Sequence, residues 1–139
     1  MDTDRLIAMA NEARAASYSP YSKFPVGAAV LSESGEIFTG CNVENASFGL
    51  TVCAERIAVF SAVAAGHQRL VAAAVVTPSQ GAPCGACRQV LAEFGPEMIV
   101  HIANPDGDCR SRTMAELLPE SFGPADLKAW AERLQNPEG

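Results

Sequence analysis

The run Leu-Val-Ala-Ala-Ala-Val-Val at residues 70–76 decides the fold of this chain. Seven apolar residues without a polar interruption have the length of a strand and predict one that is covered on both faces. Such a strand lies inside a sheet that has helices above and below it. The rest of the sequence should therefore supply neighbouring strands and two layers of helices.

Upstream of this strand, the sequence predicts a helix, a hairpin and a second helix. Apolar residues recur at three- and four-residue steps over residues 3–17, until Ser19-Pro20-Tyr21-Ser22 ends the helix. Residues 26–31 and 36–43 are typical of two strands joined by a short polar turn that contains glycine. Helical character returns over residues 52–65.

Downstream of the strand, the elements become shorter. Residues 84–94 predict a helix that Gly95-Pro96 ends, and residues 98–103 predict the next strand. A short last strand is expected over residues 109–112, followed directly by a helix whose capping box starts at Thr113. A final helix is expected over residues 126–134.

This order of elements predicts an α/β fold: a three-layer α/β/α sandwich with a mixed five-stranded sheet. The 139 residues, 48% of them hydrophobic and 19% charged, suit one domain over residues 1–139 with a substantial core. The formal net charge of −6, without a basic stripe, disfavours a nucleic acid polymer as substrate.

The N-terminal sequence has no signal-peptide pattern, and no apolar run reaches the roughly 20 residues that span a bilayer. We therefore expect no membrane partner and a cytoplasmic location. In that compartment, five unevenly spaced cysteines favour metal binding or catalysis over disulfides.

The strongest local motif is Pro83-Cys84-Gly85-Ala86-Cys87, a Cys-x-x-Cys pair where a loop enters a helix. Alone, it fits half of a structural zinc site, a redox couple or two ordinary thiols. Cys53 also stands at the start of a predicted helix, so two helix N-termini could bring three cysteines together. Positive helix ends favour the deprotonated sulfur that zinc requires, and three ligands leave one tetrahedral position for water, as in catalytic sites.

Glu55 lies two residues after Cys53, in the first turn of the helix. A lone glutamate there commonly just complements the helix dipole. Beside three cysteines, it matches the non-ligand proton carrier of zinc nucleobase deaminases, whose general pattern includes a Pro-Cys-x-x-Cys pair. Arg56 could moderate the negative charge of three thiolates around one zinc ion. His67, His101, Cys41 and Cys109 are interpreted as structural residues.

Along nearly its whole length, the chain resembles the small homotetrameric cytidine deaminases. The resemblance rests on four stretches, Tyr18-Ser19-Pro20-Tyr21-Ser22-Lys23-Phe24 with Val26-Gly27-Ala28-Ala29, Gly40-Cys41-Asn42-Val43-Glu44-Asn45-Ala46-Ser47, Cys53-Ala54-Glu55-Arg56 and Pro83-Cys84-Gly85-Ala86-Cys87-Arg88-Gln89-Val90. It implies one zinc ion per chain on Cys53, Cys84 and Cys87, with Glu55 as the catalytic proton carrier.

The same resemblance implies the substrate contacts. Asn42 and Glu44 would hold the ribose, Phe24 and Ala54 would line the nucleoside site, and Phe122 would enter the site of a neighbouring subunit. The implied reaction is the zinc-dependent hydrolytic deamination of cytidine and 2′-deoxycytidine in pyrimidine salvage. The substrate would then be a small nucleoside, and the assembly a homotetramer that shares its active sites.

Three alternatives remain at this stage. A deaminase of a related nucleoside such as blasticidin S would share the zinc motifs, although the segment at residues 44–47 and Arg56 fit the cytidine enzymes better. A nucleic acid deaminase would need a basic groove. A non-catalytic zinc or redox protein could use the same cysteines. The sequence does not rank cytidine against deoxycytidine, and it assigns no role to residues after Trp130.

Overall fold

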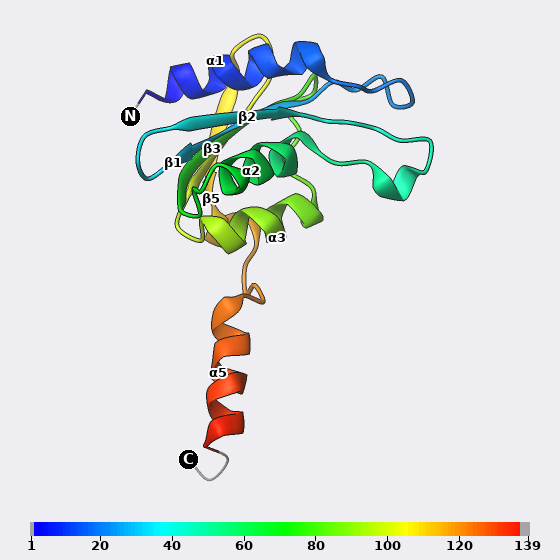
Figure 1. Ribbon diagram of the computed structural model, residues 1–139. Helices are drawn as coiled ribbons and strands as arrows, with labels where there is room; N and C mark the ends of the chain where they lie inside the picture. The colour runs from blue at the N-terminus through cyan, green and yellow to red at the C-terminus, as the bar shows by residue number, and fades with distance from the viewer. Residues whose placement is uncertain (1, 137–139) are drawn as a thin grey trace.

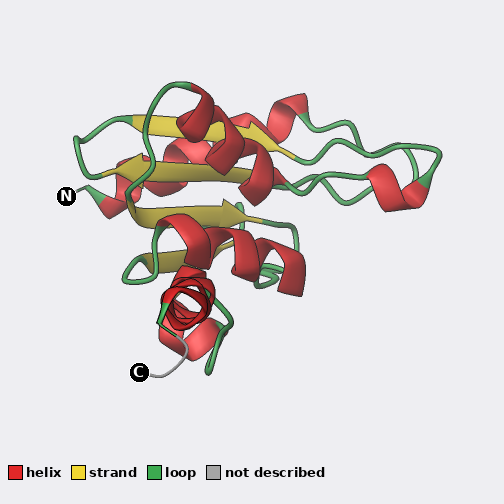
Figure 2. Ribbon diagram, turned by 60° about the horizontal axis from the view of Figure 1, so that its bottom comes forward, coloured by secondary structure: helices red, strands yellow, loops and turns green. Residues whose placement is uncertain are grey.

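The computed structural model describes residues 2–136, and a five-stranded sheet lies at its centre (Figures 1 and 2). The strands are β1 (Gly27–Ser32), β2 (Ile37–Cys41), β3 (Leu70–Val76), β4 (Ile99–Ala103) and β5 (Cys109–Thr113). Their order is β2-β1-β3-β4-β5, with β3 and β4 parallel and the other neighbours antiparallel. The predicted α/β fold with a mixed five-stranded sheet is confirmed, and the strand at residues 70–76 has the predicted bounds.

Helices cover both faces of the sheet, as the buried run of β3 predicted. The helices are α1 (Thr3–Ala13), α2 (Ala54–Ala64), α3 (Gly85–Phe94), α4 (Met114–Leu117) and α5 (Pro124–Gln135), with 3₁₀ turns at Arg14–Ala16 and Phe48–Leu50. Figure 1 shows α1 on one face of the sheet and α2 and α3 on the other.

The side chains of β3 alternate between two hydrophobic clusters. Ala73 and Val75 belong to the cluster under α2 and α3, which also contains Val59 and Leu91. The neighbouring positions of the same strand, with Leu6 of α1, belong to the cluster on the other face. The period of two along a strand therefore splits one apolar run between two cores.

Two glycines allow helices to lie very close to the sheet. A Cβ atom added at Gly27 would lie 1.9 Å from the backbone oxygen of Ala10 in α1. One added at Gly40 would lie 2.5 Å from the backbone nitrogen of Ala58 and 2.6 Å from the backbone oxygen of Ala54, both in α2. Gly40 therefore sets the position of the helix that begins next to Cys53.

Several predicted boundaries differ from the structure by a few residues. The first helix ends at Ala13, and a 3₁₀ turn continues it. The second strand ends at Cys41 and not at residue 43, because Asn42 turns its side chain oxygen toward the backbone N–H of Val26. The second helix begins at Ala54, with Cys53 as its N-cap. The 3₁₀ turn at Phe48–Leu50 has no counterpart in the sequence prediction.

The C-terminal helix α5 projects away from the body of the molecule (Figure 1). It begins at Pro124, two residues before the predicted start, and the backbone N–H of Gly123 donates to Asp126 Oδ2 at 2.8 Å. None of its residues is buried. Leu127, Trp130 and Leu134 leave apolar side chains exposed on it.

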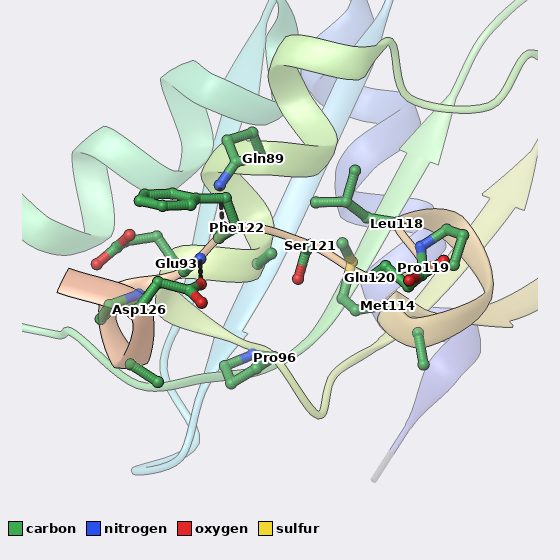
Figure 3. A pocket seen from close by; sticks show the side chains of 15 residues that line it. Gln89, Glu93, Pro96, Met114, Leu118, Pro119, Glu120, Ser121, Phe122 and Asp126 are labelled. Carbon is green, nitrogen blue, oxygen red and sulfur yellow. Dashed lines mark hydrogen bonds between the residues drawn. The ribbon is translucent and has the colours of Figure 1, made fainter. Parts of the chain in front are cut away.

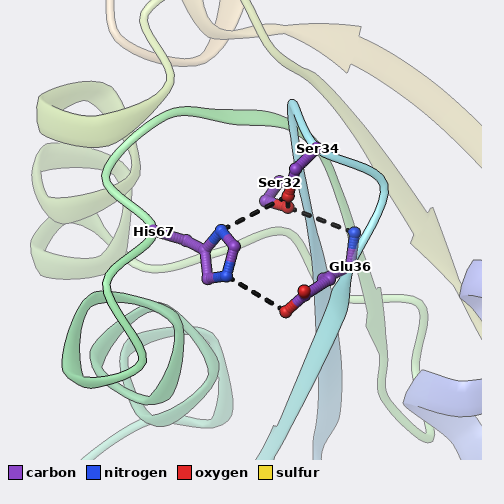
Figure 4. A network of polar contacts seen from close by, with 4 residues as sticks. All are labelled: Ser32, Ser34, Glu36 and His67. Atoms are coloured by element: carbon purple, nitrogen blue, oxygen red, sulfur yellow. Dashed lines mark hydrogen bonds and ion pairs between the residues drawn. The ribbon is translucent and has the colours of Figure 1, made fainter.

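Both histidines occupy structural positions, as expected. His67 Nε2 lies 3.0 Å from Glu36 Oε2, and its Nδ1 lies 3.4 Å from Ser34 Oγ, so the ring joins the loop after α2 to the β1–β2 hairpin (Figure 4). His101 is buried in β4, and its Nδ1 lies 2.7 Å from Ser111 Oγ. Among residues 2–136, no helix has the length and apolar character needed to cross a bilayer.

Candidate metal centre and active site

The three predicted cysteine ligands lie together at the starts of two adjacent helices. Cys53 and Cys84 are the N-cap residues of α2 and α3, and Cys87 is buried in the first turn of α3. Cys53 Sγ lies 3.8 Å from Cys84 Sγ, which in turn lies 3.5 Å from Cys87 Sγ. Two sulfurs that each bind a tetrahedral zinc at about 2.3 Å are about 3.8 Å apart, so this cluster has the spacing of a zinc site.

The cysteines of this cluster change one another's acidity. The neighbouring Cys87 thiol and the Arg56 guanidinium lower the pKa of Cys53 to about 5. The same Cys53 sulfur, together with burial, raises the pKa of Cys87 well above its ordinary value. Zinc binds sulfur as thiolate, so a zinc ion held here would take the place of the thiol protons.

Arg56 lies where the sequence placed it, beside the sulfurs. Its Nη2 donates to Cys53 Sγ at 3.6 Å and to the backbone oxygen of Thr51 at 3.5 Å. The hydrogen bond to Cys53 raises the pKa of this guanidinium further. Its Nε is buried without a hydrogen-bond partner. A permanent cation thus faces the anionic side of the cluster.

Glu55 is buried next to the cluster without being part of it. Its side chain is 5% exposed, and the set of ligand atoms within 4.8 Å of one another comprises only the three cysteines among the described residues. Burial raises the pKa of Glu55 to about 7, and the negative charge of Cys53 adds to this effect. A carboxyl group in this environment can both accept and donate a proton near neutral pH.

Asn42 is held deeply in the structure, at 8% exposure. Its Oδ1 accepts hydrogen bonds from Ser17 Oγ at 2.5 Å and from the backbone N–H of Val26 at 2.9 Å, and its Nδ2 donates to the backbone oxygen of Phe24 at 2.9 Å. Both lone pairs of Oδ1 are therefore used, and one N–H of the amide remains for a ligand.

Glu44 lies beside the loop at residues 19–24. Its Oε1 accepts from the backbone N–H groups of Tyr21 at 2.9 Å and Ser22 at 3.1 Å, and its Oε2 accepts from the hydroxyl of Ser22. The Ser22 hydroxyl is the main cause that lowers the pKa of Glu44. With Tyr21, Phe48 and Thr51, Glu44 and Ser22 line a hollow of about 380 Å³.

The other predicted substrate residues differ in exposure. Phe24 is 37% exposed, whereas Ala54 is fully buried, so only the backbone of Ala54 could reach a ligand. Phe122 is 61% exposed and lines a groove of about 590 Å³ between α3 and the segment that leads into α5 (Figure 3). None of the three cysteines lines this groove.

Comparisons with known proteins agree with this geometry. Residues 1–103 match the family model described as the cytidine and deoxycytidylate deaminase zinc-binding region. Over 136 residues, the chain is 50% identical to a cytidine deaminase of Sporosarcina psychrophila, covering 96% of this chain and all of the relative.

The chain belongs to the cytidine deaminase family.

Solved structures of cytidine deaminases have the same fold. The enzyme from Burkholderia pseudomallei is 50% identical, with a TM-score of 0.84 over 88% of this chain and 100% of that one. The enzyme from Mycobacterium tuberculosis is 45% identical, with a TM-score of 0.78 over 88% of this chain and 98% of that one. The protein is therefore a zinc-binding hydrolytic deaminase of this family.

The structure also reveals polar residues to which the sequence analysis gave no role. Ser17 and Ser22 bind the side chains of Asn42 and Glu44. Arg88 Nε donates to the backbone oxygen of Pro83 at 2.7 Å, next to a metal ligand, and Gln89 Nε2 donates to the backbone oxygen of Phe122 at 2.8 Å. Apart from the Arg88 bond, these contacts join segments at least 20 residues apart, and no sequence spacing indicates them.

Proposed function

We propose that this protein catalyses the hydrolytic deamination of cytidine and 2′-deoxycytidine to uridine and 2′-deoxyuridine, with release of ammonia. The observation that carries the proposal is the three-sulfur cluster on two helix starts, with the buried carboxyl group of Glu55 directly beside it. A cluster of three protein ligands is the arrangement of a catalytic site, and zinc held there would activate a water molecule for attack on C4 of the ring.

The protein's own residues then bind the metal and move the protons. Cys53, Cys84 and Cys87 hold the zinc as thiolates, and Arg56 offsets part of their charge. Glu55 takes a proton from the attacking water and delivers it to N3 of the cytosine ring. It then takes the remaining proton from the hydroxyl group added at C4 and donates it to the amino group, which leaves as ammonia as the C4–N bond breaks and the C4 carbonyl forms. The free N–H groups at the start of α2 add partial positive charge at this end of the site.

The capacity of Asn42 and Glu44 for further hydrogen bonds supports a nucleoside substrate. Asn42 has one N–H left to donate, and Glu44 has one lone pair left on Oε2 to accept. A sugar hydroxyl is both a donor and an acceptor, so a single hydroxyl could satisfy both residues. One hydroxyl that cytidine and 2′-deoxycytidine share is enough, and both nucleosides are therefore proposed as substrates.

A spectrophotometric assay with matched substrates tests the proposal. The purified protein, with its zinc content measured, should deaminate cytidine and 2′-deoxycytidine and turn over free cytosine far more slowly. Free cytosine has no sugar to bind Asn42 and Glu44, so its kcat/KM should be lower than that of cytidine by roughly two orders of magnitude or more. Equal kcat/KM for cytosine and cytidine would refute the nucleoside assignment. Turnover of blasticidin S but not of cytidine would favour the related antibiotic deaminase.

We further propose a homotetramer in which Phe122 enters the site of a neighbouring subunit. Phe122 lies outside its own chain's metal centre, with its ring exposed and its backbone held by Gln89. The exposed apolar side chains of α5 would also need a partner surface. A second copy of the chain would supply both contacts at once.

The same activity suggests a place in metabolism and in the cell. An enzyme that converts free cytidine nucleosides to uridine nucleosides would act in pyrimidine salvage. The cytoplasm is the proposed location, because five free cysteines, three of them arranged for metal binding, suit a reducing compartment.

A further inference from the structure

The hydroxyl group of Ser22 connects two residues of the proposed nucleoside site. Ser22 Oγ donates to Glu44 Oε2 and accepts from the backbone N–H of Phe24 at 3.0 Å. The backbone N–H of Ser22 also donates to Glu44 Oε1 at 3.1 Å. One small side chain thus fixes the orientation of a carboxylate and the start of the segment that carries an aromatic ring.

We propose that Ser22 is a positioning residue, which holds the Glu44 carboxylate and Phe24 in the arrangement that receives the sugar of the substrate. The inference rests on the proposed nucleoside deaminase activity and deepens it. Tyr21 and Ser22 occupy both lone pairs of Oε1, and the Ser22 hydroxyl occupies one of Oε2. Ser22 therefore determines the direction in which the last free lone pair of Glu44 points.

The backbone around Ser22 supports this role. Lys23 adopts a φ of 58°, a left-handed conformation that is unfavourable for a non-glycine residue. Its backbone N–H donates to the backbone oxygen of Ser19 at 3.0 Å, which closes the turn. A strained turn persists when surrounding contacts hold it, and the contacts from Ser22 to Glu44 and Phe24 are of this kind.

The electrostatics of Glu44 agree with the geometry. The Ser22 hydroxyl and the backbone N–H groups of Tyr21 and Ser22 all lower the pKa of Glu44, so the group is an ionised carboxylate at neutral pH. An ionised carboxylate is a pure acceptor and can bind a sugar hydroxyl only through an unoccupied lone pair. The donors that keep Glu44 ionised therefore also leave one lone pair, on Oε2, free to accept a hydrogen bond.

Removing the hydroxyl should weaken binding of the nucleoside without removing the chemistry at C4. Ser22→Ala is expected to raise KM for cytidine about tenfold and to change kcat by less than about threefold, because a contact made equally in ground and transition states affects KM. The KM for free cytosine should stay unchanged, since cytosine has no sugar. Ser22→Thr, which keeps the hydroxyl at an exposed position, should restore the cytidine KM.

A double-mutant cycle with Glu44→Ala separates positioning from a general effect on structure. Once Glu44 is absent, adding Ser22→Ala should raise the cytidine KM much less than it does in the unmodified protein, because only the contact with Phe24 is then left to lose. Zinc content and thermal unfolding of every variant are measured beside the kinetics, and Ser61→Ala on the exposed surface of α2 is the matched control.

The outcomes distinguish this inference from the function on which it rests. Suppose that Glu44→Ala reduces the difference in kcat/KM between cytidine and cytosine. If Ser22→Ala then raises the cytidine KM by the same factor with and without Glu44, only the positioning role is overturned. A cytidine KM that Ser22→Ala leaves unchanged overturns it as well. If Glu44→Ala leaves the difference in kcat/KM between cytidine and cytosine unchanged, the contact between Glu44 and the sugar is refuted, and so is the positioning role of Ser22. Absence of deamination in the unmodified zinc-loaded protein refutes the activity itself.

Discussion

The metal centre and the C-terminal segment differ in how much of their environment one chain supplies. At the metal centre, Cys87 and Glu55 are almost completely buried, and helices, sheet and Arg56 surround them. At the C-terminal segment, Phe122 and Trp130 are more than half exposed, and none of the residues of α5 is buried. All three metal ligands come from one chain, although Cys84 among them is exposed, while the C-terminal segment presents apolar side chains to solvent.

This difference separates two parts of the proposed reaction. Binding zinc and moving protons depend on contacts within the chain, which the helix starts of α2 and α3 fix in place. Enclosing the nucleoside depends, under the homotetramer proposal, on a ring from another chain. Substitutions at the metal centre should therefore abolish catalysis in every assembly, whereas substitutions near Phe122 should act between subunits.

The largest effect is expected at Glu55. Glu55→Ala should keep its zinc and its fold but lose at least about 10²- to 10⁴-fold in kcat, the typical contribution of general acid–base catalysis. Glu55→Gln is the control of equal size, and it should be as inactive because it cannot carry the proton. Steady-state kinetics with metal analysis of each variant provide the measurement. Near-normal turnover by either protein would contradict the proton-carrying role.

Phe122 should give the next largest effect and show whether sites are shared. Phe122→Ala should lower kcat/KM about 10- to 100-fold, as expected for removing an aromatic contact at an interface. Mixing Phe122→Ala chains with Glu55→Ala chains should then rebuild some active sites, because the two defects can fall in different pockets. The activity of the mixture after subunit exchange is compared with each parent. If exchange is verified and no activity returns, Phe122 does not act across subunits.

Substitutions on α5 should act on assembly more than on chemistry. Exchanging Leu127 and Trp130 together for alanine should shift the molecular mass in sedimentation toward smaller species, because these exposed side chains would lose their contact with the partner. Lys128→Ala, on the same helix, is the matched control and should leave the mass unchanged. A stable tetramer in the double variant would place the interface elsewhere.

The smallest effect concerns His101, at the opposite side of the sheet from the metal centre. Burial lowers the pKa of His101 below the ordinary value of 6.5, so folding favours the neutral ring. Its contribution to stability is present above about pH 6.5 and is lost as the pH falls through the lowered pKa. His101→Gln should remove this dependence. Denaturant unfolding of both proteins between pH 5 and 7.5 measures it, and parallel pH profiles would contradict it.

Elements of this fold could be predicted where the signal lies in neighbouring residues, and were missed where it depends on contacts between residues far apart in the sequence. The strand Leu70–Val76 and the capping box at Thr113 were predicted correctly because their signals lie within a few residues. The end of β2 was predicted wrongly: pairing with β1 ends at Cys41, and the side chain of Asn42 binds the backbone of Val26 and the hydroxyl of Ser17. A helix was predicted over residues 126–134 and is found at Pro124–Gln135, but periodicity alone does not indicate that this helix projects from the body without a buried residue.

The residues of the candidate site differ in the same way in how far the sequence predicted them. The three cysteines and Glu55 were found from their spacing near predicted helix starts, and the structure brings the cysteines together. The ribose role of Asn42 and Glu44 came only from family resemblance and stays a prediction. The contacts of Ser22 were missed, because its partner Glu44 is 22 residues away and a serine in a turn gives no signal of its own.

The strand order of the sheet has a consequence for how folding and zinc depend on each other. Cys84 and Cys87 are close in any conformation of the chain, but 31 residues separate Cys53 from Cys84. The intervening chain includes β3, which lies between β1 and β4, so the folded sheet places the third sulfur beside the other two. The complete ligand set then exists only in the native state, and zinc stabilises that state by mass action. Each tenfold rise in free zinc above the dissociation constant adds about 1.4 kcal/mol to the free energy of unfolding, which makes the stability of the folded enzyme depend on the metal supply.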